Sequence, residues 1–187
     1  AAVAVGSWSR RVRHPWGSAV GTSIVAVCLI WTLAAGDAAR EFARWRAEQI
    51  PVHRAAGRFL GERMAPESWL ATGNAGLIPY TSRQPTIDIV GLCDRHIALC
   101  DVPEMGEAMA GHGKGDGEYV LSRRPKVILF QNARFSDRPL RPADVARRLF
   151  SISEREMWRD ERLHERYRLV HERLPGFYFN FFERKDD

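Results

Sequence analysis

The apolar stretch GSAVGTSIVAVCLIWTLAAG, residues 17–36, decides the layout of this chain. Its twenty residues carry no formal charge. At about 1.5 Å rise per residue, an α-helix of that length crosses the ~30 Å hydrocarbon core of a bilayer. We therefore predict one transmembrane helix over residues 17–36. No second stretch of comparable length and apolarity occurs in the sequence.

The flanks of this stretch divide the rest of the chain. Residues 1–16 are a basic N-terminal segment that begins AAVAVGSW, which resembles the end of an earlier apolar segment. We therefore expect a C-terminal fragment of a larger membrane protein. Residues 37–187 are charged and interrupted by Gly and Pro, which predicts one domain large enough to bury its own core. The alternative for residues 17–36 is a signal peptide cleaved near Gly36.

The charge pattern argues against a nucleic-acid partner. The net charge is +5, yet the arginines alternate with acidic residues, as in RDER at residues 159–162. No basic run is interleaved with aromatic residues, so we expect a solvated surface beside anionic lipid head groups and no nucleic acid. Arginines flank the apolar stretch on both sides in similar number, which leaves the orientation open. Cys93 and Cys100 can pair outside the cytoplasm, but their spacing leaves that open too.

Short apolar runs alternate with helix-like segments after the apolar stretch. Apolar, rather than alternating, strands between helices favour an α/β fold, here a small mixed sheet flanked by helices with some parallel pairing. The amphipathic helix after Pro51 should dock on this sheet. We predict helices over residues 37–64, interrupted at Pro51, 143–150 and 153–174, and strands over 69–72, 86–90, 126–130 and the aromatic tail 175–182. Residues 77–80 should open a short helix or turn, and residues 101–117 should form a loop.

Two sequence blocks hold the residues best suited to chemistry. ATGNAGLIPY (71–80) leads to IDIVGLCD (87–94), and GHGKGDGEYVL (111–121) leads to RRPKVILF (123–130). They place polar side chains on loops at strand ends, where sheet folds gather their sites. These side chains are Asn74, Asp88, Asp94, His96, His112, Lys114 and Asp116.

The first block fits two interpretations. Gly73 and Gly76 suit a strand-to-helix turn with positive φ, or a helix N-terminus open to an anion such as a lipid phosphate. Asp88 either makes structural hydrogen bonds or contacts a sugar hydroxyl, because a buried carboxylate needs partners.

The second block gives the strongest candidate site. Lys114 and His112 can hold a phosphate, Asp116 can orient a sugar hydroxyl, and the glycines let backbone amides approach a ligand. A glycine loop ordered by one Lys–Asp contact explains the same residues. Asp94, His96, His112 and Asp116 have metal-ligand chemistry, but their spacing matches no dedicated motif, so we predict no metal and no cofactor. His164 and His171 should share a solvated helix face.

These blocks resemble the C-terminal soluble domain of bacterial polytopic membrane glycosyltransferases of the C superfamily, notably the terminal β-(1→2) arabinofuranosyltransferase group and its uncharacterised relatives. The shared patterns are A-T-G-x-x-G-x-I-P-Y at residues 71–80, I-D-x-x-G-L-x-D at 87–94 and G-H-x-K-x-D-G-x-Y-V-L at 111–121. Arg124, Pro125 and Ile128 follow in the expected order, and the resemblance covers residues 50–130. Cys93 and Gly113 depart from the pattern.

The resemblance implies a C-terminal module that is not catalytic by itself, because the catalytic carboxylates of such enzymes lie in an early loop between N-terminal spans. The module would lie outside the bacterial inner (cytoplasmic) membrane, in contact with membrane lipid. Its partners would be a polyprenyl-phosphate sugar donor and a cell-envelope glycan acceptor, and it would assist acceptor or lipid-phosphate binding. The expected substrate-binding residues are Gly73, Asn74, Gly76, Asp88, Asp94, His112, Lys114 and Asp116.

The alternative belongs to another class of protein. A single-span anchored domain that binds a partner protein, or scaffolds an envelope complex, needs no sugar chemistry. The pair Gly17 and Gly21 lets another helix approach closely, and the Arg/Glu-rich residues 153–174 offer a charged surface.

Overall fold

The computed structural model describes residues 16–102 and 112–185, except for the side chains of residues 16–19 and 34–35. It divides into two compact units, Ala1–Gln49 and Ile50–Asp187. Residues 103–111, which fall in the predicted 101–117 loop, lie outside the described residues, as do residues 1–15.

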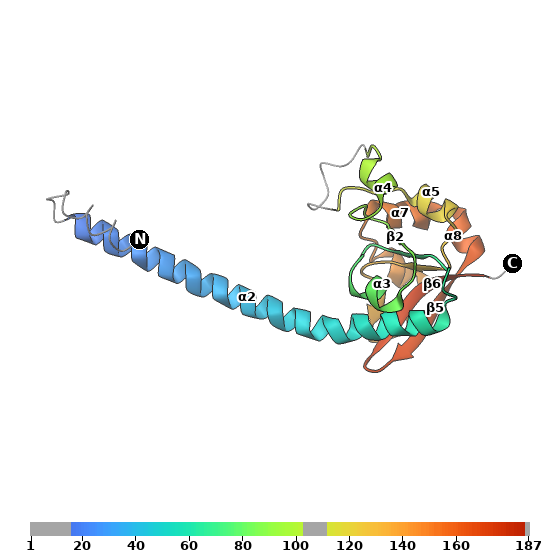
Figure 1. Ribbon diagram of the computed structural model, residues 1–187, viewed down its shortest axis with the longest axis horizontal. Coiled ribbons are helices and arrows are strands. Elements are labelled where there is room, and N and C mark those ends of the chain that lie inside the picture. The colour runs from blue at the N-terminus through green and yellow to red at the C-terminus, as the bar shows by residue number, and fades with distance from the viewer. Residues whose placement is uncertain (1–15, 103–111, 186–187) are drawn as a thin grey trace. The chain divides into compact units, whose positions relative to one another are not determined.

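The N-terminal unit is the first part of helix α2 (Trp16–Arg63), drawn in blue in Figure 1. Within the described residues this is one helix that is long and apolar enough to cross a membrane. Its most apolar window has a mean hydropathy of 1.6, and none of that window is buried. The predicted interruption at Pro51 is wrong, because α2 continues through this residue to Arg63. Proline has a helical φ and removes only one backbone donor, so packing of the following turns can maintain the helix.

A six-stranded mixed sheet forms the centre of the second unit, which confirms the predicted fold class. Strand β1 (Leu70–Thr72) lies between β2 (Thr86–Asp88) and β3 (Val127–Leu129) and is parallel to both. Strand β6 (Phe177–Arg184) runs antiparallel to β3 and to β4 (Phe135–Ser136). Strand β5 (Tyr167–Leu174) pairs with β6 along its whole length. The tail is therefore a strand, as predicted.

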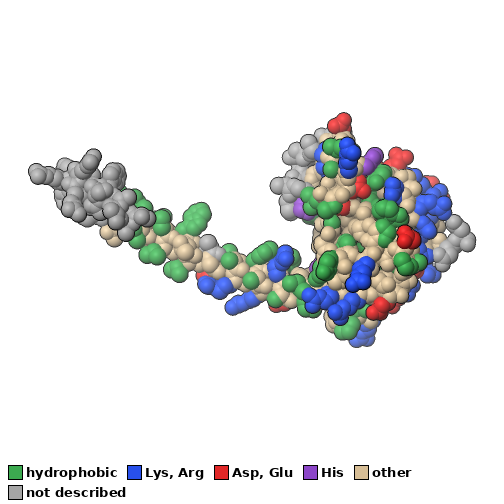
Figure 2. All heavy atoms as spheres, in the orientation of Figure 1, with side chains coloured by type: hydrophobic (Ala, Val, Ile, Leu, Met, Phe, Trp, Pro, Cys, Tyr) green, Lys and Arg blue, Asp and Glu red, His purple; other side chains and the backbone are tan. Residues whose placement is uncertain are grey.

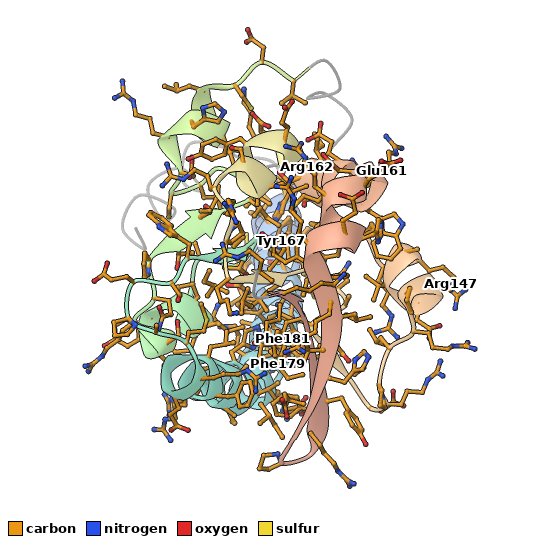
Figure 3. All side chains as sticks on the ribbon, turned by 90° about the vertical axis from the view of Figure 1, so that its right-hand side faces the viewer. Arg147, Glu161, Arg162, Tyr167, Phe179 and Phe181 are labelled. Carbon is orange, nitrogen blue, oxygen red and sulfur yellow. The ribbon has the colours of Figure 1, made fainter. Side chains whose placement is uncertain are left out.

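Helices cover both faces of the sheet because successive strand residues point to opposite sides. On one face, Leu70, Val127 and Leu129 pack against the end of α2 and against α3 (Leu77–Ser82). As predicted, this amphipathic end of α2 docks on the sheet through Ala56, Leu60 and Met64. Figure 3 shows Phe179 and Phe181 of β6 beside α2, and Phe59 of α2 lies 6.1 Å from each ring.

The other face is covered by four short helices, which gather on one side of the sheet in Figure 1. They are α4 (Arg95–Leu99), α5 (Gly117–Ser122), α7 (Ile152–Arg159) and α8 (Glu161–Arg166). Ile97, Val120, Met157 and Leu163 bring one buried side chain from each helix onto Ala71, Ile87 and Ile128 of the sheet. The short helix α6 (Pro142–Ala146) replaces the longer helix predicted over residues 143–150.

The predicted helix over residues 153–174 is wrong. The chain forms α7, breaks at Asp160, forms α8 and then enters β5. Asp160 is extended, and its carboxylate accepts a hydrogen bond from the Arg162 backbone, so it ends one helix and caps the next. The Pro175-Gly176 turn, where Gly176 has φ +88°, joins β5 to β6 as a hairpin. His164 therefore lies on α8 and His171 on β5, not on one helix face.

Candidate functional site

Helices α4 and α5 bring two segments of the resemblance together. Asp94 caps α4, and Asp116 caps α5 through the backbone N–H of Tyr119 at 2.8 Å. The His96 ring stacks on the Tyr119 ring at 3.9 Å, and its Nε2 lies 2.8 Å from the Asp116 carboxylate. The Tyr119 hydroxyl donates to Asp94 at 3.3 Å. Residues 94–96 and 116–119 thus meet on one face of the domain.

The start of α5 is held against α7 by backbone contacts. The Asp116 N–H donates to the Ser153 hydroxyl, which itself donates to the Ile89 carbonyl. The Gly117 N–H donates to Glu156 Oε2 at 2.6 Å. A Cβ on Gly117 would lie 2.6 Å from the Glu156 Cβ, so only glycine allows this approach. Gly115 and Gly117, which we expected to let a ligand approach, instead allow the close approach of helix α7.

A pocket of about 360 Å³ opens beside this contact. Among the described residues seven line this pocket, of which five are acidic and none is basic. They come from the end of α4, the loop before α5, and helices α5 and α7, with one from the break before α8. The lining residues are Cys100, Asp101, Gly115, Asp116, Glu118, Glu156 and Asp160.

The charge in this acidic pocket is only partly balanced. Asp160 pairs with Arg162 at 2.6 Å, and hydrogen bonding to Arg162 lowers the pKa of Asp160. Hydrogen bonding to Asp160, and more weakly the Glu118 charge, raise the pKa of Arg162, so this arginine also balances part of the Glu118 charge. Asp101 has no hydrogen bond or ion pair within residues 16–102 and 112–185. Such a pocket attracts cations and hydrogen-bond donors and repels phosphate. Burial, and then the Asp94 charge, raise the pKa of Tyr119, so this phenol stays a donor at neutral pH.

The two predicted phosphate ligands lie elsewhere. The Lys114 ammonium donates to the backbone carbonyl of Cys100, and the His112 ring packs edge-on against Phe150 at 5.2 Å. Neither side chain lines the pocket. Of the eight predicted binding residues, Asp116 alone does so within the described chain.

The glycines of the first block take a different role. Neither Gly73 nor Gly76 has positive φ, contrary to one interpretation, and α3 after them is a single short turn. The Asn74 side chain accepts from the Gly76 N–H, and the Gly73 carbonyl accepts from the Gln131 amide at 3.2 Å. A Cβ on Gly73 would meet the Gln131 side chain at 2.9 Å. This turn therefore closes onto the loop that follows β3.

That closure falls where sheets of this topology usually bind ligands. The order β2-β1-β3 places the switch point between the carboxyl ends of β1 and β3. Just beyond the carboxyl end of β3, the buried Glu154 side chain takes up backbone donors. Its carboxylate accepts from the backbone N–H groups of Gln131 and Phe150, each at 2.6 Å, and of Ser151 at 3.3 Å. The amides that would hold an anion are occupied by the protein's own carboxylate.

The charge of Glu154 is set by its surroundings. Burial raises its pKa, and the three backbone hydrogen bonds and the nearby Arg134 charge oppose that rise. Burial lowers the pKa of Arg134 to about 10, which still leaves it protonated at neutral pH. Arg134 therefore keeps a positive charge in the interior near Glu154.

The remaining predicted residues make local structural contacts. Asp88 is buried and accepts from the backbone N–H groups of Val90 and Cys93 at 3.1 and 2.7 Å. Cys93 and Cys100 are free thiols, and Cys100 Sγ donates to the Ile97 carbonyl.

Sequence reasoning missed most of the pocket, including Glu118, Glu156 and Asp160. One available signal was the aspartate placed before each short helix, since Asp at an N-cap marks a helix start and would have located α4, α5 and α8. The convergence of the carboxylates themselves has no local signal.

Comparison with known proteins gives one match. No curated protein and no solved structure matches this chain. A family model described as a domain of unknown function (DUF8728) matches residues 40–184, which include nearly all of the α/β unit. The chain therefore belongs to the DUF8728 family.

Proposed function

We propose that this chain is a membrane-anchored, non-catalytic module that binds the glycan acceptor of a polyprenyl-phosphate-sugar-dependent glycosyltransferase. The observation that carries the proposal is the acidic pocket, whose carboxylates can accept hydrogen bonds from several sugar hydroxyls at once. The apolar part of α2 would anchor the module in the bacterial cytoplasmic membrane, with the α/β unit on the extracytoplasmic side.

The pocket favours the acceptor over the lipid phosphate. A phosphate needs cations or free backbone amides, whereas the lining residues that the structure describes include no basic side chain. The backbone donors at the start of α5 are already engaged, because the Asp116 N–H donates to the Ser153 hydroxyl and the Gly117 N–H donates to Glu156. A polyprenyl-phosphate donor would then be bound by another part of the enzyme.

The test uses the full chain in lipid nanodiscs. Isotope-labelled protein is titrated with short arabinan and other cell-wall oligosaccharides, and separately with a short-chain polyprenyl phosphate. We expect oligosaccharides to shift NMR signals of residues 115–118 and 156–160, and the polyprenyl phosphate to leave them unchanged.

Two matched substitutions assign the binding to the pocket. Glu118→Gln removes an exposed lining carboxylate and should weaken oligosaccharide binding at least about tenfold, the effect of losing one charge-assisted hydrogen bond. Glu165→Gln makes the same change at an exposed α8 position that does not line the pocket and should leave binding unchanged. Absence of oligosaccharide shifts at millimolar concentration would reject the proposal and favour the partner-binding alternative.

A further inference from the structure

The N-terminal unit has a stripe of residues, apolar except for Gln49, that continues beyond the membrane segment. Gly21, Ile24, Cys28 and Trp31 are spaced alternately three and four residues apart. Seven residues after Trp31, the same register continues with Ala38, Phe42, Trp45 and Gln49. This is the a/d spacing of a coiled coil, in which one narrow face of each helix meets a partner helix. We call these eight positions the heptad stripe.

The aromatic end of the heptad stripe lies outside the predicted span. Phe42 and Trp45 stack at 5.8 Å, and they are 59% and 53% exposed. Trp45 is nine residues beyond Gly36, so a helix along the membrane normal places it about 13 Å past the hydrocarbon core. The head-group layer is only about 5–8 Å thick on each side. The lipid therefore leaves this aromatic pair in water, where two adjacent exposed rings are costly.

The charges beside the stripe match a second copy of the same chain. Numbering Phe42 as position a and Trp45 as position d places Glu41 at g and Arg46 at e. In a parallel, in-register pair of helices, a g residue faces the e residue five positions later on the other helix. Glu41 would thus face Arg46 of the other copy, and symmetry repeats the pair.

The membrane favours the parallel arrangement. All copies inserted by one route have the same orientation, so neighbouring apolar helices run parallel. On the outward side, Asp37 and Arg44 at c and Arg40 at f are charged, whereas Ala43 at b and Ala47 at f are small. Figure 2 shows hydrophobic side chains along the apolar part of α2, followed by Lys and Arg side chains farther along it.

We propose that two copies of this chain pair through the heptad stripe as a parallel coiled coil, with Phe42 and Trp45 buried between them. The pairing surface is confined to residues 21–49 and is independent of what the α/β unit binds. Whether or not the two copies pair through this surface, the proposed function of the α/β unit is unaffected.

The first test is oxidative cross-linking of the full chain in membranes. The Cys93→Ser/Cys100→Ser variant retains Cys28, which lies on the stripe at position a, where two copies bring their Cβ atoms within disulfide reach. The matched control adds Cys28→Leu and Leu29→Cys, which moves the thiol to the next position at nearly the same depth. We expect at least about fivefold more cross-linked dimer through Cys28. Equal yields from both variants would overturn the proposal.

The second test reverses charges and needs no thiol. Glu41→Arg places like charges opposite one another and should weaken the dimer roughly fivefold. The double variant Glu41→Arg/Arg46→Glu should restore dimer formation. Asp37→Arg, the same reversal at an outward position, should leave it unchanged. If Glu41→Arg and Asp37→Arg behave alike in sedimentation of the detergent-solubilised chain, the parallel pairing is wrong.

Discussion

The His96 imidazole lies flat against the Tyr119 phenol, with ring centroids 3.9 Å apart and an angle of 17° between the planes. This contact joins α4 to α5 beside the acidic pocket. The Asp116 carboxylate, which lines the pocket, hydrogen-bonds the His96 ring and also caps α5. The shape of the pocket therefore depends on one stacked pair whose members are 23 residues apart in sequence.

Removing this stack should loosen the joint between α4 and α5. His96→Ala removes both the ring contact and the partner of Asp116, and we expect a loss of about 1 kcal/mol in the free energy of unfolding. Tyr119→Phe retains the stack and removes only the hydroxyl bond to Asp94, so its loss should be smaller. Urea unfolding of the full chain in detergent measures both. A larger loss for Tyr119→Phe would contradict the role given to the stack.

The packing of α5 on α7 predicts an overpacked variant. Gly117→Ala places a Cβ 2.6 Å from the Glu156 Cβ and 2.8 Å from the Met157 nitrogen, so one helix must shift. We expect a loss of about 1–3 kcal/mol in the free energy of unfolding. Gly76→Ala is the control, since its Cβ would approach only the end of the Asn74 side chain. Comparable melting temperatures for the two variants would show that α5 does not need this close approach.

Because the buried Glu154 carboxylate accepts several backbone hydrogen bonds, we expect its replacement by an amide to lower the stability of the fold strongly. Glu154→Gln replaces one acceptor oxygen by an NH₂ group, which then faces a backbone N–H of the Gln131 or Phe150 pair. An unsatisfied buried donor should cost about 1–3 kcal/mol of unfolding free energy. Glu165→Gln on the exposed face of α8 should change stability by less than about 0.5 kcal/mol. Chemical unfolding measures the stability of both variants. Equal stabilities would show that the Glu154 hydrogen bonds do not stabilise the fold.

The ion pairs of Glu183 predict how stability depends on pH. Burial alone would raise the pKa of Glu183, but Arg168 and Arg63 outweigh it and lower the pKa below the ordinary 4.5. A carboxyl with a lowered pKa in the folded state stabilises the fold above its ordinary pKa, and this stability is lost as pH falls through the folded value.

Glu183→Gln should therefore be less stable than the unmodified chain at pH 7, by roughly 1 kcal/mol because both arginines are partly exposed. Its stability should also fall less steeply below about pH 4.5. Glu172→Gln removes the more exposed partner of Arg63 and should change both quantities less. Parallel acid-unfolding curves for Glu183→Gln and the unmodified chain would exclude this contribution.

Features that depend only on neighbouring residues were predictable from the amino-acid sequence. Twenty uncharged residues predict an apolar helix whatever surrounds it, and the VILF run after Pro125 predicts a buried strand in the same way. Strands that are apolar on both faces require helices on both sides, which is why the α/β class and the docking of the end of α2 were predictable.

Features that depend on partners distant in the sequence arise only in the folded domain. Residues 167–174, YRLVHERL, lack the strict polar–apolar alternation of a strand, and they form one because β6 offers a complete partner across the Pro175-Gly176 turn. The acidic pocket gathers carboxylates from residues 101 to 160, and it exists because Gly115 and Gly117 let the α5 segment approach α7. From the sequence alone, Glu154 is expected to be a solvated helix residue. In the structure, three backbone N–H groups from two loops hold its carboxylate in the interior. Local hydrophobic patterns specify which elements form, whereas close approach and shared hydrogen bonds between distant segments specify where a site can be.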